Sequence, residues 1–308
     1  MSRPAEYSFI RYLAAKKSVD DRALNRRVLE ALAQAVAARS AGTPLRVLEI
    51  GCGIGAMAER LVKWGILKDA DYTGIDLEPA CVAEALRRLQ RFAELNDLAV
   101  ETETERLKLT GPDLNLSLTF EAADCFAFAD RETGRSTWDL LVAHAFLDLV
   151  DLGEALPRLL ALLRPGGWFY FPLNFDGATV FQPVIEPAWE GRLMDLYHQT
   201  MIRRGLGGKV SDGSTTGRRL FAALKAAGAE VLAAGGSDWV VFPEAGGYPE
   251  DEAYFLHFII HTIQEALADY PGWDRRALEA WIDRRHAQVE AGELVYLAHQ
   301  LDFFGRVL

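Results

Sequence analysis

The chain has 308 residues, of which 50% are hydrophobic and 25% charged, a composition typical of a globular protein and not of a disordered chain. Its 33 Lys and Arg against 44 Asp and Glu give a formal net charge of −11. A general nucleic-acid-binding protein needs a basic surface to neutralise phosphates, so we expect no nucleic-acid partner.

Hydrophobic periodicity predicts alternating helices and strands along the first half of the chain. Apolar residues recur at helical spacing from residue 19, where Asp20 or Asp21 can cap a helix. The predicted elements are, in order, a helix over 19–38, a strand over 45–50, a helix over 56–65, a strand over 72–76, a helix over 79–95, a hairpin around 111–113 that leads into another strand, a strand over 138–144, a helix over 155–163 and a strand over 168–174. This alternation predicts a parallel sheet with helices on both faces.

The alternation of strands and helices becomes less regular after residue 176, and few residues over 178–215 favour a strand. The elements expected beyond this stretch are a helix over 217–228, a strand-like run over 230–242 interrupted by two glycines, helices over 250–290 and a late strand or two over 293–307. We expect one structural domain in three parts. These are an N-terminal helical lid (1–40), a cofactor-binding core (41–177) and substrate-cap helices with the remaining strands (178–308).

The strongest motif is a glycine-rich turn that follows the first predicted strand. Gly51, Gly53 and Gly55 lack a Cβ, so a ligand can approach the backbone closely, and the next helix offers unpaired N–H groups. Gly51 and Gly53 with Ala56 also satisfy the dinucleotide pattern GxGxx(G/A). A turn needed only for packing remains an alternative.

Three acidic positions lie near this turn. Asp76 ends the second predicted strand, 25 residues after Gly51, where a carboxylate can accept hydrogen bonds from ribose hydroxyls. Asp124 ends the next strand, where an adenine amino group could lie. Glu49 lies inside the apolar strand, and burial of its carboxylate is unfavourable unless it is hydrogen-bonded. A structural hydrogen bond and a direct ligand contact both remain open for Glu49.

The motifs VLEIGCGIG, GID, AAD, WDLLVAH and LRPGGWFYF follow one another over about residues 45–175. In this order they resemble the class I S-adenosylmethionine-dependent methyltransferases. The resemblance implies a Rossmann-like, doubly wound α/β fold with seven strands, the last of them antiparallel. It also implies S-adenosyl-L-methionine as the cofactor and S-adenosyl-L-homocysteine as its product. The second half resembles, more loosely, small-molecule methyltransferases with a helical cap inserted after the fifth strand.

The resemblance assigns roles to individual residues. The glycines would line the methionine part of the cofactor, Asp76 would hold the ribose hydroxyls with Leu77 against adenine, and Asp124 would lie at the adenine edge. His144 would face the boundary between cofactor and substrate. The residues implied to contact the cofactor are Glu49, Gly51, Cys52, Gly53, Gly55, Asp76, Leu77, Asp124, Cys125 and His144. The sequence after the fourth strand is His-Ala-Phe-Leu instead of Asn/Asp-Pro-Pro-Tyr/Phe, which favours a small-molecule acceptor over an amide or nucleobase.

The candidates for catalysis and for acceptor binding are more widely spread. His144 and His198 are the candidate general bases if the acceptor needs to lose a proton. The candidate substrate-binding residues are Asn174, Asp176, Tyr197, Arg204 and Trp239. The structural alternatives are turn formation for Asn174 and Asp176, a solvated cap helix for Tyr197 and Arg204, and a strand bulge for Trp239. Tyr7, Tyr12 and Lys16 could fold over the cofactor, although only their position suggests it.

Neither a metal site nor membrane insertion is expected. The three cysteines lack the spacing of metal ligands, and His257 with His261 lacks the further ligand of a set such as HExxH. The N-terminus has no apolar signal core, and the most apolar later stretch (253–263) is too short to span a bilayer. We therefore expect a cytoplasmic protein without a membrane partner. The apolar stretch could form core or a dimer face, so a homodimer remains an alternative.

The sequence thus predicts a methyltransferase that transfers a methyl group to a small molecule by in-line displacement. The alternatives are a non-catalytic cofactor-binding scaffold, an NAD-dependent dehydrogenase that uses the same glycine turn, and an aminopropyl transferase. The usual acidic pair of the last class is not evident, although Asp148 and Asp151 lie near the expected place.

Overall fold

The computed structural model describes residues 2–39, 42–103, 106–203, 205, 210–271 and 274–308. A single mixed sheet runs through the molecule in the order β3-β4-β5-β2-β1-β6-β7-β10-β8, with β9 also paired to β10. The strands are β1 (Leu45–Ile50), β2 (Asp69–Asp76), β3 (Ala99–Glu103), β4 (Arg106–Gly111), β5 (Leu114–Ala122), β6 (Trp138–Ala143), β7 (Leu163–Gln182), β8 (Ala229–Gly236), β9 (Trp239–Val241) and β10 (Val295–Val307).

The sheet confirms the predicted parallel core. Strands β5, β2, β1, β6 and β7 are parallel neighbours, whereas β10 runs antiparallel between β7 and β8, as expected for the last strand. The predicted count of seven strands is too low, because ten strands are present in the described ranges. Alternating apolar and polar residues let β3 and β4 pair antiparallel beyond β5 and lengthen that edge.

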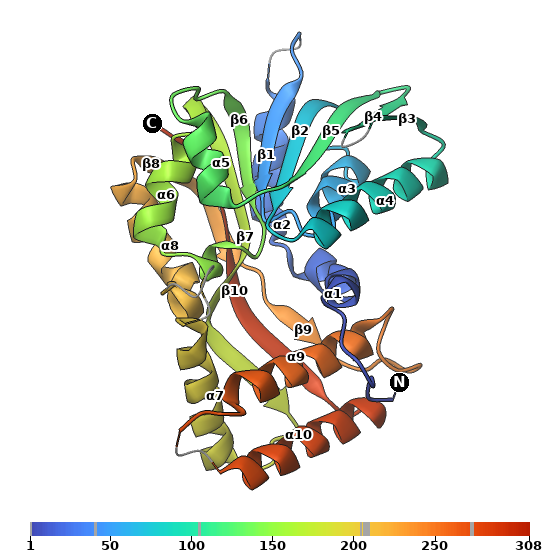
Figure 1. Ribbon diagram of the computed structural model, residues 1–308, viewed down its shortest axis with the longest axis vertical. Helices are drawn as coiled ribbons and strands as arrows, with labels where there is room; N and C mark the ends of the chain where they lie inside the picture. The colour runs from blue at the N-terminus through green and yellow to red at the C-terminus, as the bar shows by residue number, and fades with distance from the viewer. Residues whose placement is uncertain (1, 40–41, 104–105, 204, 206–209, 272–273) are drawn as a thin grey trace.

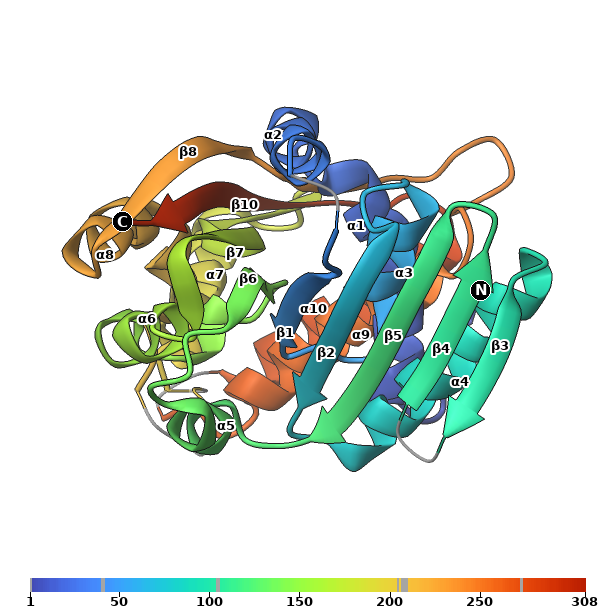
Figure 2. The same cartoon turned by 90° about the horizontal axis from the view of Figure 1, so that it is seen from above.

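Helices cover both faces of the sheet (Figures 1 and 2). Buried side chains of α2, α3 and α4 pack on one face, and those of α5, α6 and α8 pack on the other. The helices are α1 (Phe9–Ala23), α2 (Arg26–Ala37), α3 (Ala56–Lys63), α4 (Pro79–Leu95), α5 (Cys125–Glu132), α6 (Leu152–Leu160), α7 (Pro187–Met201), α8 (Thr216–Ala226), α9 (Glu252–Leu267) and α10 (Arg275–Glu290). None of the helices that the structure describes combines the length and apolar character required to cross a membrane.

The single N-terminal helix predicted over 19–38 is in fact two helices. Leu24 leaves the helical conformation, and Asn25 caps α2 by accepting a hydrogen bond from the Val28 N–H at 3.1 Å. Local side-chain bonding of this kind competes with helix continuation. Asp20 and Asp21 therefore lie inside α1 and cap no helix, so both carboxylates are available for contacts with other side chains.

Strand β7 is much longer than the predicted strand over 168–174. It pairs with β10 from Trp168 to Gln182, through an irregularity at residues 176–178, which lie opposite His299. Asp176 and Gly177 therefore form a bulge inside a strand and not the predicted turn after one. The domain boundary expected at residue 177 falls inside β7.

The continuation of β7 and β10 carries a second layer of helices. The helices α1, α7, α9 and α10 surround the far part of β7, β9 and β10 (Figure 1), and buried side chains of all these elements form a core cluster of their own. The helices after residue 178, where the sequence analysis expects a substrate cap, thus lie on strands that continue directly from the central sheet. α1 reaches back from this layer toward the carboxyl ends of β1 and β2.

The histidines of this layer make no metal site. His257 Nδ1 lies 2.8 Å from His286 Nδ1, and His261 stacks on Tyr7 with ring centroids 4.0 Å apart. Across the residues that the structure places, no group of three His, Cys, Asp or Glu is arranged to hold a metal ion. Cys52, Cys81 and Cys125 are free and buried.

The buried histidine pair predicts acid sensitivity. Burial, together with the positive charge of Arg3 and the neighbouring His257, lowers the pKa of His286 to about 3 from 6.5. The unfolded chain therefore takes up this proton first, so stability is lost as the pH falls below about 6.5. At pH 5 the part of this loss that His286 contributes should approach about 2 kcal/mol in the free energy of unfolding. We expect urea titrations at pH 7.5 and 5.0 to show this loss in the free energy of unfolding.

The matched variant is His286→Phe, which cannot be protonated. Its stability should fall less than that of the wild type between the two pH values, whatever its absolute stability. Equal losses in both proteins would show that the histidine pair does not set the acid sensitivity.

Candidate active site

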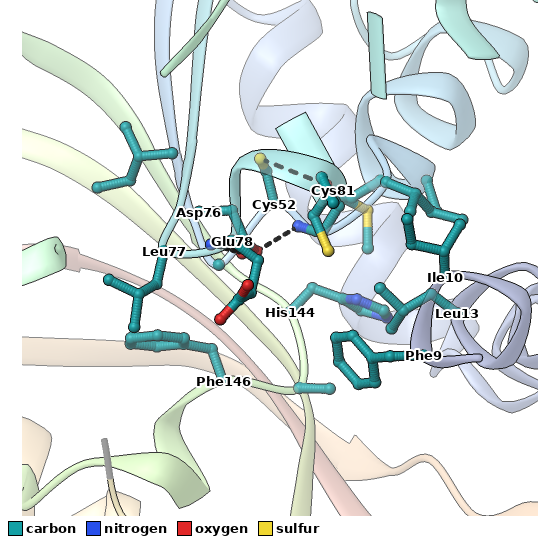
Figure 3. A pocket seen from close by; sticks show the side chains of 18 of the residues that line it. Phe9, Ile10, Leu13, Cys52, Asp76, Leu77, Glu78, Cys81, His144 and Phe146 are labelled. Carbon is teal, nitrogen blue, oxygen red and sulfur yellow. Dashed lines mark hydrogen bonds between the residues drawn. The ribbon is translucent and has the colours of Figure 1, made fainter. Parts of the chain in front are cut away.

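A cavity of about 720 Å³ lies where the carboxyl ends of β1, β2 and β6 meet the N-terminal helix α1 (Figure 3). Its size is in the range of small-molecule and cofactor sites, and open α/β sheets place ligands at this end of their strands. Eight of the predicted site residues line it, namely Gly51, Cys52, Gly53, Asp76, Leu77, Asp124, Cys125 and His144.

The glycine turn forms the floor of this cavity. Gly51, Gly53 and Gly55 have φ values of +67°, +52° and +72°, a region that side chains disfavour. A Cβ on Gly51 would lie 2.6 Å from the ring of Phe146, and one on Gly53 would lie 3.3 Å from Leu13. The backbone at these two positions is therefore kept open by the absence of side chains.

Gly55 has a different role from the predicted one. It does not line the cavity, and a Cβ there would lie 3.1 Å from the Cβ of Ala85 on α4. The third glycine thus allows the left-handed turn and the close approach of α4.

The carboxylate of Asp76 is fixed at the carboxyl end of β2. Its Oδ2 accepts a hydrogen bond from the Gly53 N–H at 2.8 Å, and its Oδ1 accepts one from the Glu78 N–H at 3.0 Å (Figure 3). A carboxylate has about four acceptor positions, so both oxygens retain capacity for ligand hydroxyls. The next residue, Leu77, exposes 51% of its surface, which provides an apolar contact for a ligand ring.

Asp124 and Cys125 lie beyond β5, at the start of α5. Asp124 Oδ1 caps this helix by accepting hydrogen bonds from the N–H groups of Phe126 and Ala127, both at 2.9 Å. Burial raises the pKa of the Cys125 thiol to about 11, so it is neutral at physiological pH. The pair offers one anionic and one neutral contact at this end of the cavity.

Residues 48–169, which run from within β1 into the start of β7, match a family model described as a methyltransferase domain. These residues form a methyltransferase domain. The match confirms the resemblance indicated by the sequence motifs.

Curated relatives match part of the chain. The ubiquinone biosynthesis O-methyltransferase of Burkholderia cenocepacia is 31% identical over 127 residues, which cover 41% of this chain and 43% of the relative. The protein of the same name from Bordetella avium is 25% identical over 151 residues, or 48% and 51% of the two chains. The chain thus matches the curated relatives over about half of their length.

Solved structures resemble the whole chain at low identity. An S-adenosylmethionine-dependent methyltransferase from Thiobacillus denitrificans, in complex with S-adenosyl-L-homocysteine, is 15% identical with a TM-score of 0.47, and the alignment covers both chains completely. One from Geobacter sulfurreducens, with the same ligand, is 14% identical with a TM-score of 0.45 and 96% and 97% coverage.

The helix α1 lies outside the methyltransferase domain and closes one side of its cavity. The helix and its N-cap residue Ser8 contribute residues that the sequence analysis did not assign to the site. These are Ser8, Phe9, Ile10, Leu13 and Asp20, together with Lys16, which was considered only by position. The other helix of the predicted lid, α2, packs on β8 and β10 and not on the cavity.

A buried carboxylate joins α1 to the domain. Asp20 Oδ2 lies 2.7 Å from Lys16 Nζ and 3.3 Å from His144 Nε2, and its Oδ1 accepts a hydrogen bond from Trp239 Nε1 at 2.9 Å. Burial would raise the pKa of Asp20, but Lys16, His144 and Arg60 together hold it well below its usual range. The i, i+4 spacing of Lys16 and Asp20 was the one sequence signal for this pair.

His144 follows β6 and is nearly buried within the cavity wall. Burial and the positive charge of Lys16 lower its pKa to about 4, against the opposing effect of Asp20. The imidazole is therefore neutral at physiological pH, the state in which it can accept a proton.

Glu49 does not line the cavity of the methyltransferase domain. It is 1% exposed, and its carboxyl group accepts a hydrogen bond from the Tyr72 hydroxyl on the neighbouring strand. Burial raises the pKa of Glu49 to about 8. A protonated carboxyl within the sheet fits the structural alternative for Glu49 and not the direct ligand contact.

The predicted acceptor residues Asn174 and Asp176 also lie away from the cavity. Asn174 is fully buried in β7 and donates hydrogen bonds to the Phe171 and Leu301 carbonyls at 2.7 and 2.9 Å. Asp176 pairs with Arg218, with Oδ1 2.7 Å from Nε. Because β7 continues as a strand, both side chains are used within the sheet and its bulge.

The residues predicted on the cap helix are dispersed as well. Tyr197 is buried in the core of the cap layer. His198 Nε2 lies 2.9 Å from Thr179 Oγ1, in a separate hollow of about 370 Å³ between α7 and β7. Trp239 does not line the cavity, but it contacts two residues that do, through its hydrogen bond to Asp20 and through its ring, whose centroid lies 5.4 Å from Lys16 Nζ. Arg204 lies outside the described residues.

Proposed function

We propose that the protein is an S-adenosylmethionine-dependent methyltransferase (EC 2.1.1.-) acting on a small molecule. The observation that carries the proposal is the Asp76 carboxylate, held by the Gly53 and Glu78 amides beside the glycine turn of a methyltransferase domain. Such a carboxylate can accept two charge-assisted hydrogen bonds from a ribose diol. The names of the curated relatives and of the S-adenosylhomocysteine complexes agree with this activity.

The residues present fit S-adenosylmethionine. Gly51 and Gly53 keep the floor of the cavity open where a Cβ would meet Phe146 or Leu13. Asp76 would hold the ribose, and Leu77 would pack on the adenine ring with Asp124 and Cys125 at its edge; all four residues line the cavity. When bound, the cofactor supplies an activated methyl group on a cationic sulfur. The protein contributes alignment, which can account for several kcal/mol of the barrier.

We propose a hydroxyl oxygen as the acceptor atom, which the names of the curated relatives support. A hydroxyl must lose its proton during methylation, and His144 is the neutral base within the cavity wall. The Asp20 carboxylate lies beside this base, with Oδ2 3.3 Å from His144 Nε2. Phe9, Phe146 and Leu149 also line the cavity, which favours an acceptor with an apolar body.

Calorimetric titration tests the cofactor assignment. We expect S-adenosyl-L-homocysteine to bind and NADH not to bind, with thermal stabilisation of about 2.7 kcal/mol when the ligand is present at 100 times its dissociation constant. Binding of NADH alone would favour the dehydrogenase alternative. Binding of S-adenosyl-L-homocysteine without turnover of any hydroxylated acceptor would favour the non-catalytic scaffold.

A further inference from the structure

The apolar stretch over 253–263, a possible dimer face from its sequence, lies in α9 and belongs to the core. Phe255, Leu256, Ile260 and Ile263 are fully buried in the cluster that α9 shares with β7, β9 and β10. Figure 1 shows α9 and α10 lying across these strands. These side chains are therefore not available to a second copy of the chain.

The opposite face of the same strands is apolar and exposed to solvent. Val180 of β7, Leu297 of β10 and Val240 of β9 are cross-strand partners, and such partners point to the same face. Val180 and Val240 are 41% and 40% exposed, and Leu297 is partly exposed. The next pair of partners on this face is Gln182 and Val295. We call these five residues the outer face.

The outer face has no charged side chain, although the chain as a whole has a net charge of −11. Two copies with this charge repel each other, and the repulsion is weakest where neither copy presents a charged group. Contiguous exposed apolar surfaces are typical of interaction sites. The charge balance favours a second copy of the chain as the occupant, because a basic partner would be attracted to carboxylates instead.

The two edges of the outer face are complementary in shape. At one edge Phe242, the residue after β9, exposes 47% of its surface. At the other edge lies the hollow of about 370 Å³ between α7 and β7, lined by Val180 and Gln182 together with Val184 and Met194. An aromatic side chain that fills a pocket of the partner is typical of the centre of a protein interface.

A two-fold axis along β10 brings these two edges together. β10 is the middle strand here, because β7 and β9 pair with the same residues of β10 from opposite sides. Rotation by 180° about an axis parallel to β10 places β9 of one copy over β7 of the other. The strands of the two copies are then aligned, as in sheets that pack face to face. Each copy presents Phe242 to the hollow of the other, so the contact is closed and symmetric.

We infer that the protein forms a homodimer in which the outer faces of two copies pack against each other about this axis. The inference is independent of the proposed function, because no residue of the outer face lines the cavity of the methyltransferase domain.

Sedimentation equilibrium of the full chain tests the inference. The wild type should have the mass of two chains at tens of micromolar, and a monomeric wild type would overturn the inference. Val240→Asp and Val180→Lys each introduce one charge per copy, and therefore two into the interface. Each variant should weaken dimerisation roughly 100-fold or more, because removing an ion from water costs several kcal/mol. A dimer that persists in both variants would place the contact elsewhere.

An equimolar mixture of the two variants tests the position of the axis. In a mixed dimer the ammonium at position 180 of one copy faces the carboxylate at position 240 of the other, while the second contact of this kind keeps both valines. The mixture should therefore dimerise roughly 10-fold more tightly than either variant alone, which misfolded variants would not do. A mixture as monomeric as its components would overturn the arrangement about β10.

Leu232→Asp is the matched control for Val240→Asp. Leu232 is 46% exposed, but it lies on β8, which pairs with residues 301–307 of β10 and not with the part that carries the outer face. The control adds the same charge and should leave dimerisation within threefold of the wild type. Equal weakening by Leu232→Asp and Val240→Asp would overturn the inference, because it would indicate a general effect of added negative charge.

Discussion

Asp76→Ala should weaken the binding of S-adenosyl-L-homocysteine by roughly 2–4 kcal/mol, or about 30- to 1,000-fold, because two charge-assisted hydrogen bonds to the ribose would be lost together. The substitution also leaves the Gly53 and Glu78 amides without their acceptor, so the glycine turn loses the bond that now orders it. The loss of the ligand bonds and the loss of order in the turn both weaken binding. Calorimetric titration measures their combined effect on the affinity.

The controls for this prediction separate the ligand bonds from the order of the turn. Asp76→Asn keeps one carbonyl oxygen for the turn but loses the charge, so we expect an intermediate affinity. Asp69→Ala removes the exposed carboxylate at the other end of β2, where Asp69 accepts a hydrogen bond from Asn115 at 2.9 Å, and should leave the affinity unchanged. An affinity of Asp76→Ala within threefold of the wild type would contradict the assignment of Asp76 to the ribose.

Elements with strong local signals were predicted accurately. The first strand (45–50) and the helix over 79–95 have the predicted bounds, because a buried apolar run ending in glycine and a proline in the first helical turn are encoded locally. The glycine turn and Asp76 were recognised for the same reason. Each lies at the end of a strand whose direction and burial follow from its own sequence.

The incorrect predictions concern residues whose positions depend on partners far away in the sequence. β7 continues to Gln182 because β10, more than 100 residues later, supplies a partner along its whole length. No local pattern encodes that pairing, so Asn174 and Asp176 were placed at a strand end that does not exist. Asp20 was expected to cap a helix, and its burial among Lys16, His144 and Trp239 arises only when α1, β6 and β9 come together.

The missed lid residues have a similar explanation. Phe9, Ile10 and Leu13 form one apolar side of α1, a pattern that indicates burial but not the surface against which the helix packs. Leu13 lies against the glycine turn, and the break at Leu24 and Asn25 lets α1 take this position separately from α2. The cavity is thus formed jointly by a recognisable methyltransferase domain and by a helix whose role is apparent only in three dimensions.

His144→Gln should lower kcat roughly 10²- to 10⁴-fold while changing the affinity for S-adenosyl-L-homocysteine little, if His144 removes the acceptor proton. The matched variant is His198→Gln, because His198 contacts Thr179 in a separate hollow and should leave kcat unchanged. The two variants test the two candidate bases under identical conditions. Equal kcat in wild type and His144→Gln would remove His144 from the reaction.

The pH dependence provides an independent test of His144. Because burial and Lys16 lower its pKa to about 4, the ring is neutral, and able to accept a proton, at every pH well above 4. The kcat of the wild type should therefore not fall between pH 8 and about pH 5.5 on account of this residue, whereas a base with an ordinary histidine pKa near 6.5 would already be mostly protonated at pH 5.5. A titration near 6.5 that persists in His144→Gln would assign proton transfer to another group. One that disappears in that variant would show that the bound acceptor raises the pKa of His144.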